Sequence, residues 1–161
     1  MKIELLGLVF AVFVGGCAGP HAAQQTEDPV GRITREQLGP EFLTAYDTVH
    51  IQTEFVDMIR QANAGVHMLV FLGTWCSDSK REVPRFLKIV DAAGIPADRI
   101  TLLALDRKKT SPEGVEVRYV IERVPTFVFL KKETEIGRIV ETPQTTLEGD
   151  ILTILAAAIQ R

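Results

Sequence analysis

The chain has 161 residues, of which 46% are hydrophobic and 24% charged, a composition typical of one globular domain. Its 18 Lys and Arg against 21 Asp and Glu give a formal net charge of −3, so we expect no nucleic-acid partner. Two cysteines are too few for a disulfide-stapled small protein or a four-cysteine zinc site, and the three histidines show no ligand spacing. We expect no metal and no other cofactor.

Residues 1–16 have the pattern of a secretory signal peptide. Lys2 precedes an almost unbroken apolar run over residues 5–14, and two glycines end it. The run is too short to span a bilayer as a stable helix. A charged start, an apolar stretch and small residues before a cleavage site are together typical of an export signal, although Glu4 does not fit the charged start.

The next residues suggest lipidation. Val14, Gly15, Gly16 and Cys17 resemble the lipobox of bacterial lipoproteins. The resemblance implies that Cys17 carries a diacylglyceryl thioether and begins the mature chain. The alternative is an ordinary cleaved signal, or an N-terminal anchor, with an incidental cysteine. Ala18 stands where an aspartate often retains such proteins at the inner membrane, so the resemblance favours an outer-membrane anchor facing the periplasm.

Residues 17–32 form the predicted lipidated N-terminus and linker. They mix Ala, Gln, Pro and Gly with no apolar periodicity, which is typical of a flexible tether. The remainder, residues 33–161, is the predicted folded domain, and its length is sufficient for a sizeable core.

The predicted elements alternate between helices and strands. Thr34 and Gln37 have capping-box spacing and predict a short helix that Gly39 and Pro40 end. Apolar residues at helical spacing, or in short continuous runs, predict the later elements. These are helices over 52–63, 77–93 and 147–159, a weakly amphipathic segment over 115–121, and strands over 67–73, 99–106, 127–130 and 136–140.

This order predicts an α/β fold. Alternating strands and helices imply a mixed sheet with helices on both faces and right-handed crossovers in its parallel part. Pro84 lies inside the helix predicted over 77–93 and should kink it.

Cys76 is the candidate reactive residue. It follows a predicted buried strand and starts a helix, where free backbone N–H groups and the helix dipole favour a thiolate. The cations Lys80, Arg81 and Arg85 on the same helix act in the same direction, whereas Asp78 acts against it. The alternative is that Cys76 is an inert, half-buried small residue.

The stretch Trp75–Ser79 resembles the active site of the thioredoxin superfamily, in which Trp and Cys open a Cys-x-x-Cys motif. Pro84 matches the proline that kinks the active-site helix of that superfamily, and the element order agrees from about residue 52 onward. The resemblance implies a thioredoxin-like fold, a mixed sheet flanked by helices on both faces, with Cys76 as the catalytic thiol.

The resemblance also implies a substrate-binding loop. Val124, Pro125 and Thr126 match the loop whose cis proline faces the reactive sulfur in the superfamily. By this resemblance the backbone of Val124 pairs with an extended substrate, and Trp75 covers one side of the thiol.

Two departures from the superfamily restrict the chemistry. Ser79 replaces the resolving cysteine, so the motif is WCxxS, and Val70 and Leu102 replace the buried Asp and Lys of the proton relay. A dithiol cycle within the motif is therefore excluded. We expect Ser79 to donate a hydrogen bond to the Cys76 sulfur, and an external thiol to release any mixed disulfide.

Two hypotheses follow for the function. The first is a lipid-anchored envelope protein whose Cys76 exchanges disulfides with partner proteins or low-molecular-weight thiols. The second is a non-catalytic binding module with an idle cysteine. In addition, Arg107, Lys108 and Lys109 place three cations in one turn, either as a small docking patch or as a solvated face.

Overall fold

The computed structural model describes residues 28–63 and 65–159, so the predicted signal peptide, Cys17 and most of the predicted linker lie outside the described residues. The sheet has five strands in the order β1-β3-β2-β4-β5. β2 and β3 are parallel, and the other neighbours are antiparallel. The strands are β1 (Gly31–Ile33), β2 (His67–Leu72), β3 (Ile100–Ala104), β4 (Thr126–Lys131) and β5 (Thr134–Val140).

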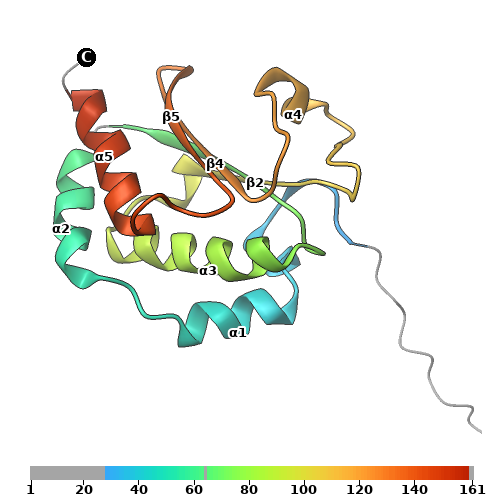
Figure 1. The fold of residues 1–161 in the computed structure, drawn as a ribbon, viewed down its shortest axis with the longest axis horizontal. Coiled ribbons are helices and arrows are strands. Elements are labelled where there is room, and N and C mark those ends of the chain that lie inside the picture. The colour runs from blue at the N-terminus through green and yellow to red at the C-terminus, as the bar shows by residue number, and fades with distance from the viewer. Residues whose placement is uncertain (1–27, 64, 160–161) are drawn as a thin grey trace, which may run out of the picture.

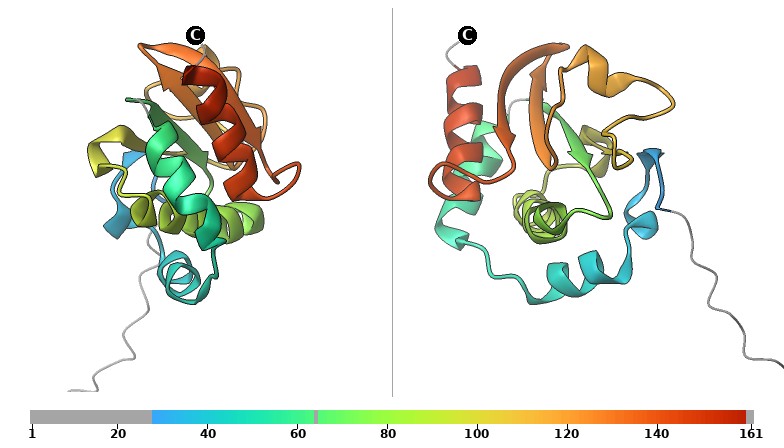
Figure 2. Two further views of the ribbon diagram at one scale, coloured as in Figure 1. Left: turned by 90° about the vertical axis from the view of Figure 1, so that its left-hand side faces the viewer. Right: turned by 45° about the vertical axis from the view of Figure 1, so that its right-hand side comes forward.

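The helices cover the two faces of the sheet unequally (Figures 1 and 2). α1, α2, α3 and α5 pack on one face, and α4 with its flanking loops covers the other. The predicted mixed sheet with helices is confirmed. The helices are α1 (Pro40–Thr48), α2 (Thr53–Ala62), α3 (Ser77–Ala92), α4 (Val115–Arg118) and α5 (Leu147–Ile159), with short 3-10 turns at Arg35–Gln37 and Ala97–Arg99. Among the described residues, no helix is both long and apolar enough to cross a membrane.

The short helix predicted from Thr34 is confirmed as the 3-10 turn Arg35–Gln37, which has the Thr34–Gln37 capping box and ends before Gly39. Two further elements are present that the sequence does not predict. The first is α1, since Gly39 is its N-cap and Pro40 its first residue. Proline is favoured at that position because its missing N–H would have no partner in the helix. β1 begins at Gly31, inside the predicted linker, and pairs with β3. The folded part of the chain therefore begins before residue 33.

The central strand β2 carries the core on both of its sides. Met68, Val70 and Leu72 point into the larger cluster beneath the four helices, and Leu69 and Phe71 point into the smaller cluster on the α4 side. This explains why β2 is a continuous apolar run rather than an alternating one. Packing on both faces also fixes the end of β2 at Leu72, where the chain leaves the sheet toward Cys76.

α3 is fixed to the sheet through aromatic packing. The fully buried Phe86 ring stacks on Phe127 of β4 at a centroid distance of 4.6 Å and meets Phe129 edge-on at 6.4 Å. At the next residue toward the N-terminus of the helix, Arg85 forms an ion pair of 2.8 Å with the buried Glu148 of α5. These contacts position α3, and with it the thiol at its N-terminal end.

We expect Phe86→Ala to lower the free energy of unfolding by about 3 to 5 kcal/mol, because it leaves a cavity between α3 and β4. Urea denaturation followed by circular dichroism measures this loss. Val117→Ala is the control: that side chain is 73% exposed, so the free energy should change by less than about 0.5 kcal/mol. Equal effects of the two substitutions would contradict this packing.

Candidate thiol site

Cys76 occupies the junction between the central strand and α3. β2 ends at Leu72, the chain turns through Gly73, and Cys76 is the N-cap residue of α3. Its N–H donates to the Gly73 carbonyl at 3.0 Å, and its carbonyl accepts the Lys80 N–H at 3.0 Å. Within the described ranges Cys76 is a free, half-buried cysteine. Its backbone is thus held by both the turn and the helix.

The sulfur lies against the loop that precedes β4. Cys76 Sγ donates to the carbonyl oxygen of Val124 at 3.3 Å, and the Val124–Pro125 peptide bond is cis. The structure therefore brings together two segments that the sequence places 48 residues apart. The hydrogen bond requires the thiol proton, so Cys76 loses it on ionisation and the Val124 carbonyl becomes free to accept another donor.

Ser79 has a different partner from the one expected. Its hydroxyl oxygen accepts the Gly73 N–H at 3.1 Å, and its side chain is fully buried. Among the hydrogen bonds of the described residues, none joins Ser79 to the Cys76 sulfur. Ser79 therefore closes the turn that carries the thiol, because it pairs a backbone donor that burial would otherwise leave unsatisfied.

Trp75 is held in place by residues that its own motif does not contain. The indole Nε1 donates to the Leu105 carbonyl at 2.9 Å, and the Arg107 guanidinium lies 5.5 Å from the ring centroid. The ring also lies against Gly73: a Cβ added there would be 2.7 Å from Trp75 Cε2. Glycine is required at this position because a side chain would displace the indole ring.

Thr126 is not placed to touch a substrate with its side chain. It is the first residue of β4, is 2% exposed, and donates its hydroxyl proton to the Arg123 carbonyl at 2.7 Å. Its side chain stabilises the Val124–Pro125 loop from behind. A sequence motif cannot distinguish a threonine that contacts substrate from one that supports the loop, because either threonine would stand at the same position.

Lys80, Arg81 and Arg85 of α3 are engaged in ion pairs, whereas Lys88 donates to the backbone carbonyls of Asp47 and Val49. The expectation that Lys80, Arg81 and Arg85 act on the thiol is therefore corrected: each already neutralises a carboxylate, so its field at the sulfur is offset. The pairs are Lys80 with Glu41, Arg81 with Asp78 and with Glu82 at 2.7 Å each, and Arg85 with Glu148 at 2.8 Å. The hydrogen bonds to Glu82 and Asp78 raise the pKa of Arg81.

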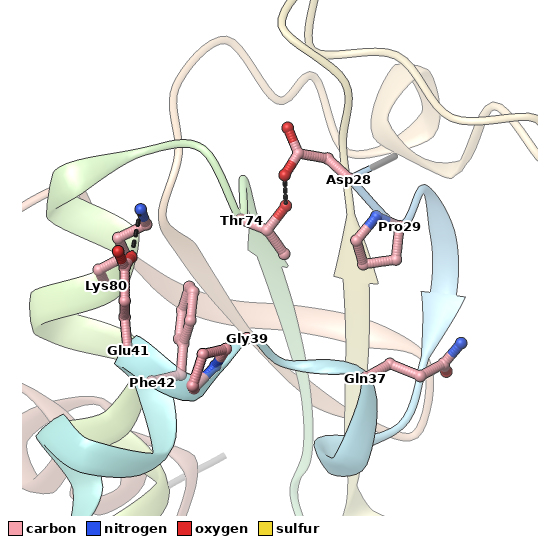
Figure 3. Close-up of a pocket in the computed structure, with 9 residues that line it drawn as sticks. Asp28, Pro29, Gln37, Gly39, Glu41, Phe42, Thr74 and Lys80 are labelled. Atoms are coloured by element: carbon pink, nitrogen blue, oxygen red, sulfur yellow. Dashed lines mark hydrogen bonds and ion pairs between the residues drawn. The ribbon is translucent and has the colours of Figure 1, made fainter. Parts of the chain in front are cut away.

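A hollow of about 250 Å³ lies beside the same turn, on the α1 side (Figure 3). Thr74 contributes to its wall and donates to Asp28 at 3.0 Å, while Lys80 and Glu41 form an ion pair on the opposite wall. Cys76 is not among its lining residues. The polar groups on both walls already have partners, so the hollow adds no reactive group to the thiol site.

The part of the chain that the structure describes contains no group of three or more His, Cys, Asp or Glu side chains able to hold a metal ion. The site residues consist of one thiol, one buried hydroxyl, an indole and a backbone carbonyl. This arrangement supports nucleophilic chemistry at sulfur.

These features define a class of α/β proteins with the thioredoxin fold: a five-stranded mixed sheet, a cysteine at the start of the helix after the central strand, and a cis-proline loop against the sulfur. The chain belongs to the thioredoxin family, because the model of that family matches residues 32–152.

Two solved structures with TM-scores above 0.5 agree with this fold, and a third chain is similar to this one over a smaller share of its length. A protein of unknown function from Pseudomonas aeruginosa is 15% identical, with a TM-score of 0.53 over 74% of this chain and 82% of its own. An HIV epitope-scaffold is 16% identical, with a TM-score of 0.53 over 75% of this chain and 84% of its own. Mitochondrial thioredoxin 3 from Saccharomyces cerevisiae is 24% identical, with a TM-score of 0.39 over 66% of this chain and 96% of its own.

We expect Gly73→Ala to move the indole ring of Trp75 away from Leu105, because the added Cβ overlaps the ring. Trp75 is the one tryptophan of the chain, so its fluorescence emission reports the change directly and should shift to longer wavelength as the ring gains water. Gly39→Ala is the matched control, since no heavy atom lies within 4 Å of its added Cβ. An unchanged emission in Gly73→Ala would contradict this geometry.

Proposed function

We propose that this protein exchanges disulfides through the single thiol of Cys76, forming mixed disulfides with partner proteins or low-molecular-weight thiols. One observation carries the proposal: the half-buried sulfur lies 3.3 Å from the Val124 carbonyl, beside the cis Val124–Pro125 bond. Membership of the thioredoxin family supports a redox role.

The reaction requires no second cysteine in the motif. The Cys76 thiolate attacks one sulfur of a substrate disulfide, a new sulfur–sulfur bond forms, and the other half of the substrate leaves as a thiolate. Cys76 is thereby oxidised and the leaving half reduced. Because Ser79 has no thiol, an external thiol completes the cycle by attacking the mixed disulfide and releasing Cys76.

Ionisation of the thiol is coupled to substrate alignment. As long as Cys76 is protonated, its S–H group occupies the Val124 carbonyl. When the thiolate forms, this carbonyl becomes available to accept an N–H from an extended partner segment, as in strand addition. The same step therefore creates the nucleophile and frees one of the groups that align the substrate.

The second candidate is a binding module that keeps the fold and leaves Cys76 idle. The ion pairs of Lys80, Arg81 and Arg85 favour this candidate, because a cation already paired with a carboxylate contributes little to stabilising a thiolate. In that case the cis-proline face would bind a partner without covalent chemistry. The two candidates differ in whether a covalent complex depends on Cys76.

We further propose that the domain is exported and tethered to the cell envelope. Residues 1–16 would be removed as a signal peptide, and Cys17 would carry the lipid that holds the protein in the outer membrane, facing the periplasm. The segment between Cys17 and β1 would allow the thiol to reach partners at some distance from the membrane.

Cys76→Ser should abolish disulfide-linked complexes, because it removes the nucleophilic sulfur and leaves a hydroxyl of similar size. The complexes are measured by non-reducing gel electrophoresis after acid quenching and alkylation of free thiols. Ser77→Ala, a change at the exposed neighbouring residue, is the control and should keep the complexes. If complexes persist in Cys76→Ser, or if the parent protein forms none, the binding module becomes the better account.

Cys17→Ser should release the protein from the membrane fraction of a Gram-negative host, because no sulfur remains to accept the diacylglyceryl group. Fractionation and the intact mass of the mature N-terminus measure the outcome, with Cys76→Ser as the control that keeps the lipid. An unchanged membrane association of Cys17→Ser would contradict lipid anchoring at this residue.

A further inference from the structure

The turn after β3 presents three consecutive cations on a well-built backbone. The Asp106 carboxylate accepts the N–H groups of Lys108 at 2.8 Å and Thr110 at 2.9 Å, and the Thr110 hydroxyl at 3.0 Å. The hydrogen bond from the Thr110 N–H is the main reason that the pKa of Asp106 is lowered. Lys109 has a φ of +63°, which is uncommon for a residue with a side chain. The turn therefore has a specific conformation. The Asp106 carboxylate binds groups of Lys108 and Thr110 within the turn rather than a cationic side chain.

We call the three consecutive cations Arg107, Lys108 and Lys109 the basic turn. Within residues 28–63 and 65–159, none of the three forms an ion pair. Lys80, Arg81 and Arg85 of α3 differ in this respect, since each is paired with a carboxylate. On a chain whose net charge is −3, this turn is a local positive surface.

The basic turn lies beside Trp75, the residue that precedes Cys76 in the chain. The Leu105 N–H donates to the carbonyl of Leu72, the last residue of β2, at 2.8 Å, and the Leu105 carbonyl accepts the Trp75 indole N–H. The Arg107 guanidinium lies 5.5 Å from the centroid of the Trp75 ring, and Trp75 directly precedes Cys76 in the sequence. In Figures 1 and 2 the loop after β3 runs beside the N-terminal end of α3.

We propose that the basic turn binds acidic residues next to the cysteine of a partner protein, so that Cys76 exchanges preferentially with disulfides flanked by Asp or Glu. This inference rests on the proposed thiol–disulfide function and names its substrate class. Unpaired cations close to the reacting atom attract anionic segments and orient them during encounter, without becoming buried. Because these charges face solvent, the preference should depend on ionic strength.

The test uses peptides that differ only in charge. Each contains one cysteine activated as a mixed disulfide with 2-thiopyridine and flanked by Asp, Ser or Lys on both sides. The Cys76 thiolate attacks the peptide sulfur, the peptide becomes bonded to Cys76, and 2-thiopyridone leaves and is followed by its absorbance. At low salt we expect the rate constant for the Asp peptide to exceed that for the Lys peptide by about tenfold or more, and the ratio to fall at high salt.

Substitution of the basic turn should remove the preference. In the triple variant Arg107→Ser, Lys108→Ser and Lys109→Asn, the Asp and Lys peptides should react at similar rates. Lys109→Asn and Lys132→Asn form a matched pair, because both residues have positive φ, of 63° and 49°, and Lys132 follows the far end of β4. The first should reduce the preference and the second should leave it unchanged.

Each outcome is decisive. Uncharged 2,2′-dithiodipyridine should react at the same rate with the parent and with Lys109→Asn, a variant that leaves Arg107 beside Trp75 in place, which shows that the thiol and fold are intact. Equal rates for the three peptides, or a preference that survives in the triple variant, would overturn the role of the basic turn and leave the exchange function standing. No release from any peptide or from dithiodipyridine by the parent protein would overturn the exchange function itself.

Discussion

The contact between the Cys76 sulfur and the Val124 carbonyl is the constraint on which the site depends. β2 and β4 are antiparallel neighbours, and their register places Phe71 opposite Thr126. The end of one strand therefore lies beside the start of the other, and the cis-proline loop meets the chain that leaves β2. Phe86 fixes α3 against β4, so the sheet register and the helix together bring the thiol within 3.3 Å of the carbonyl.

Charge is distributed differently on the two sides of this contact. On the α3 side, Lys80, Arg81 and Arg85 are paired with carboxylates, so they fix the helix and its neighbours rather than act on the sulfur. On the opposite side, the cations of the basic turn form no ion pair within the part of the chain that the structure describes, and the Arg107 guanidinium lies over the Trp75 ring. The first arrangement stabilises the domain, and the second is the basis of the proposed preference for acidic partners. Ser79 also has a structural partner rather than the thiol, since its hydroxyl oxygen accepts the Gly73 N–H.

Local patterns predict most of the fold, and long-range contacts explain what they miss. The apolar run of β2 and the position of Cys76 after it follow from sequence alone, whereas three-residue β1 is too short to show alternation. Gly39 and Pro40 separate the 3-10 turn Arg35–Gln37 from α1, and α1 is stabilised by long-range packing on α3 that the local pattern does not show. The hydrogen-bond partners of Trp75 and Ser79 depend on the conformation of the turn between β2 and α3. The residue types alone do not specify that conformation.

The most direct test compares alkylation of Cys76 in the folded and unfolded chain at one pH, in a Cys17→Ser protein with one remaining cysteine. Iodoacetamide reacts with the thiolate, so the rate reports both ionisation and access of the sulfur. If the fold activates the thiol for exchange, the folded protein reacts faster than the same protein in guanidinium chloride. Slower reaction of the folded protein would mean that the fold protects an idle cysteine, and would contradict the exchange function.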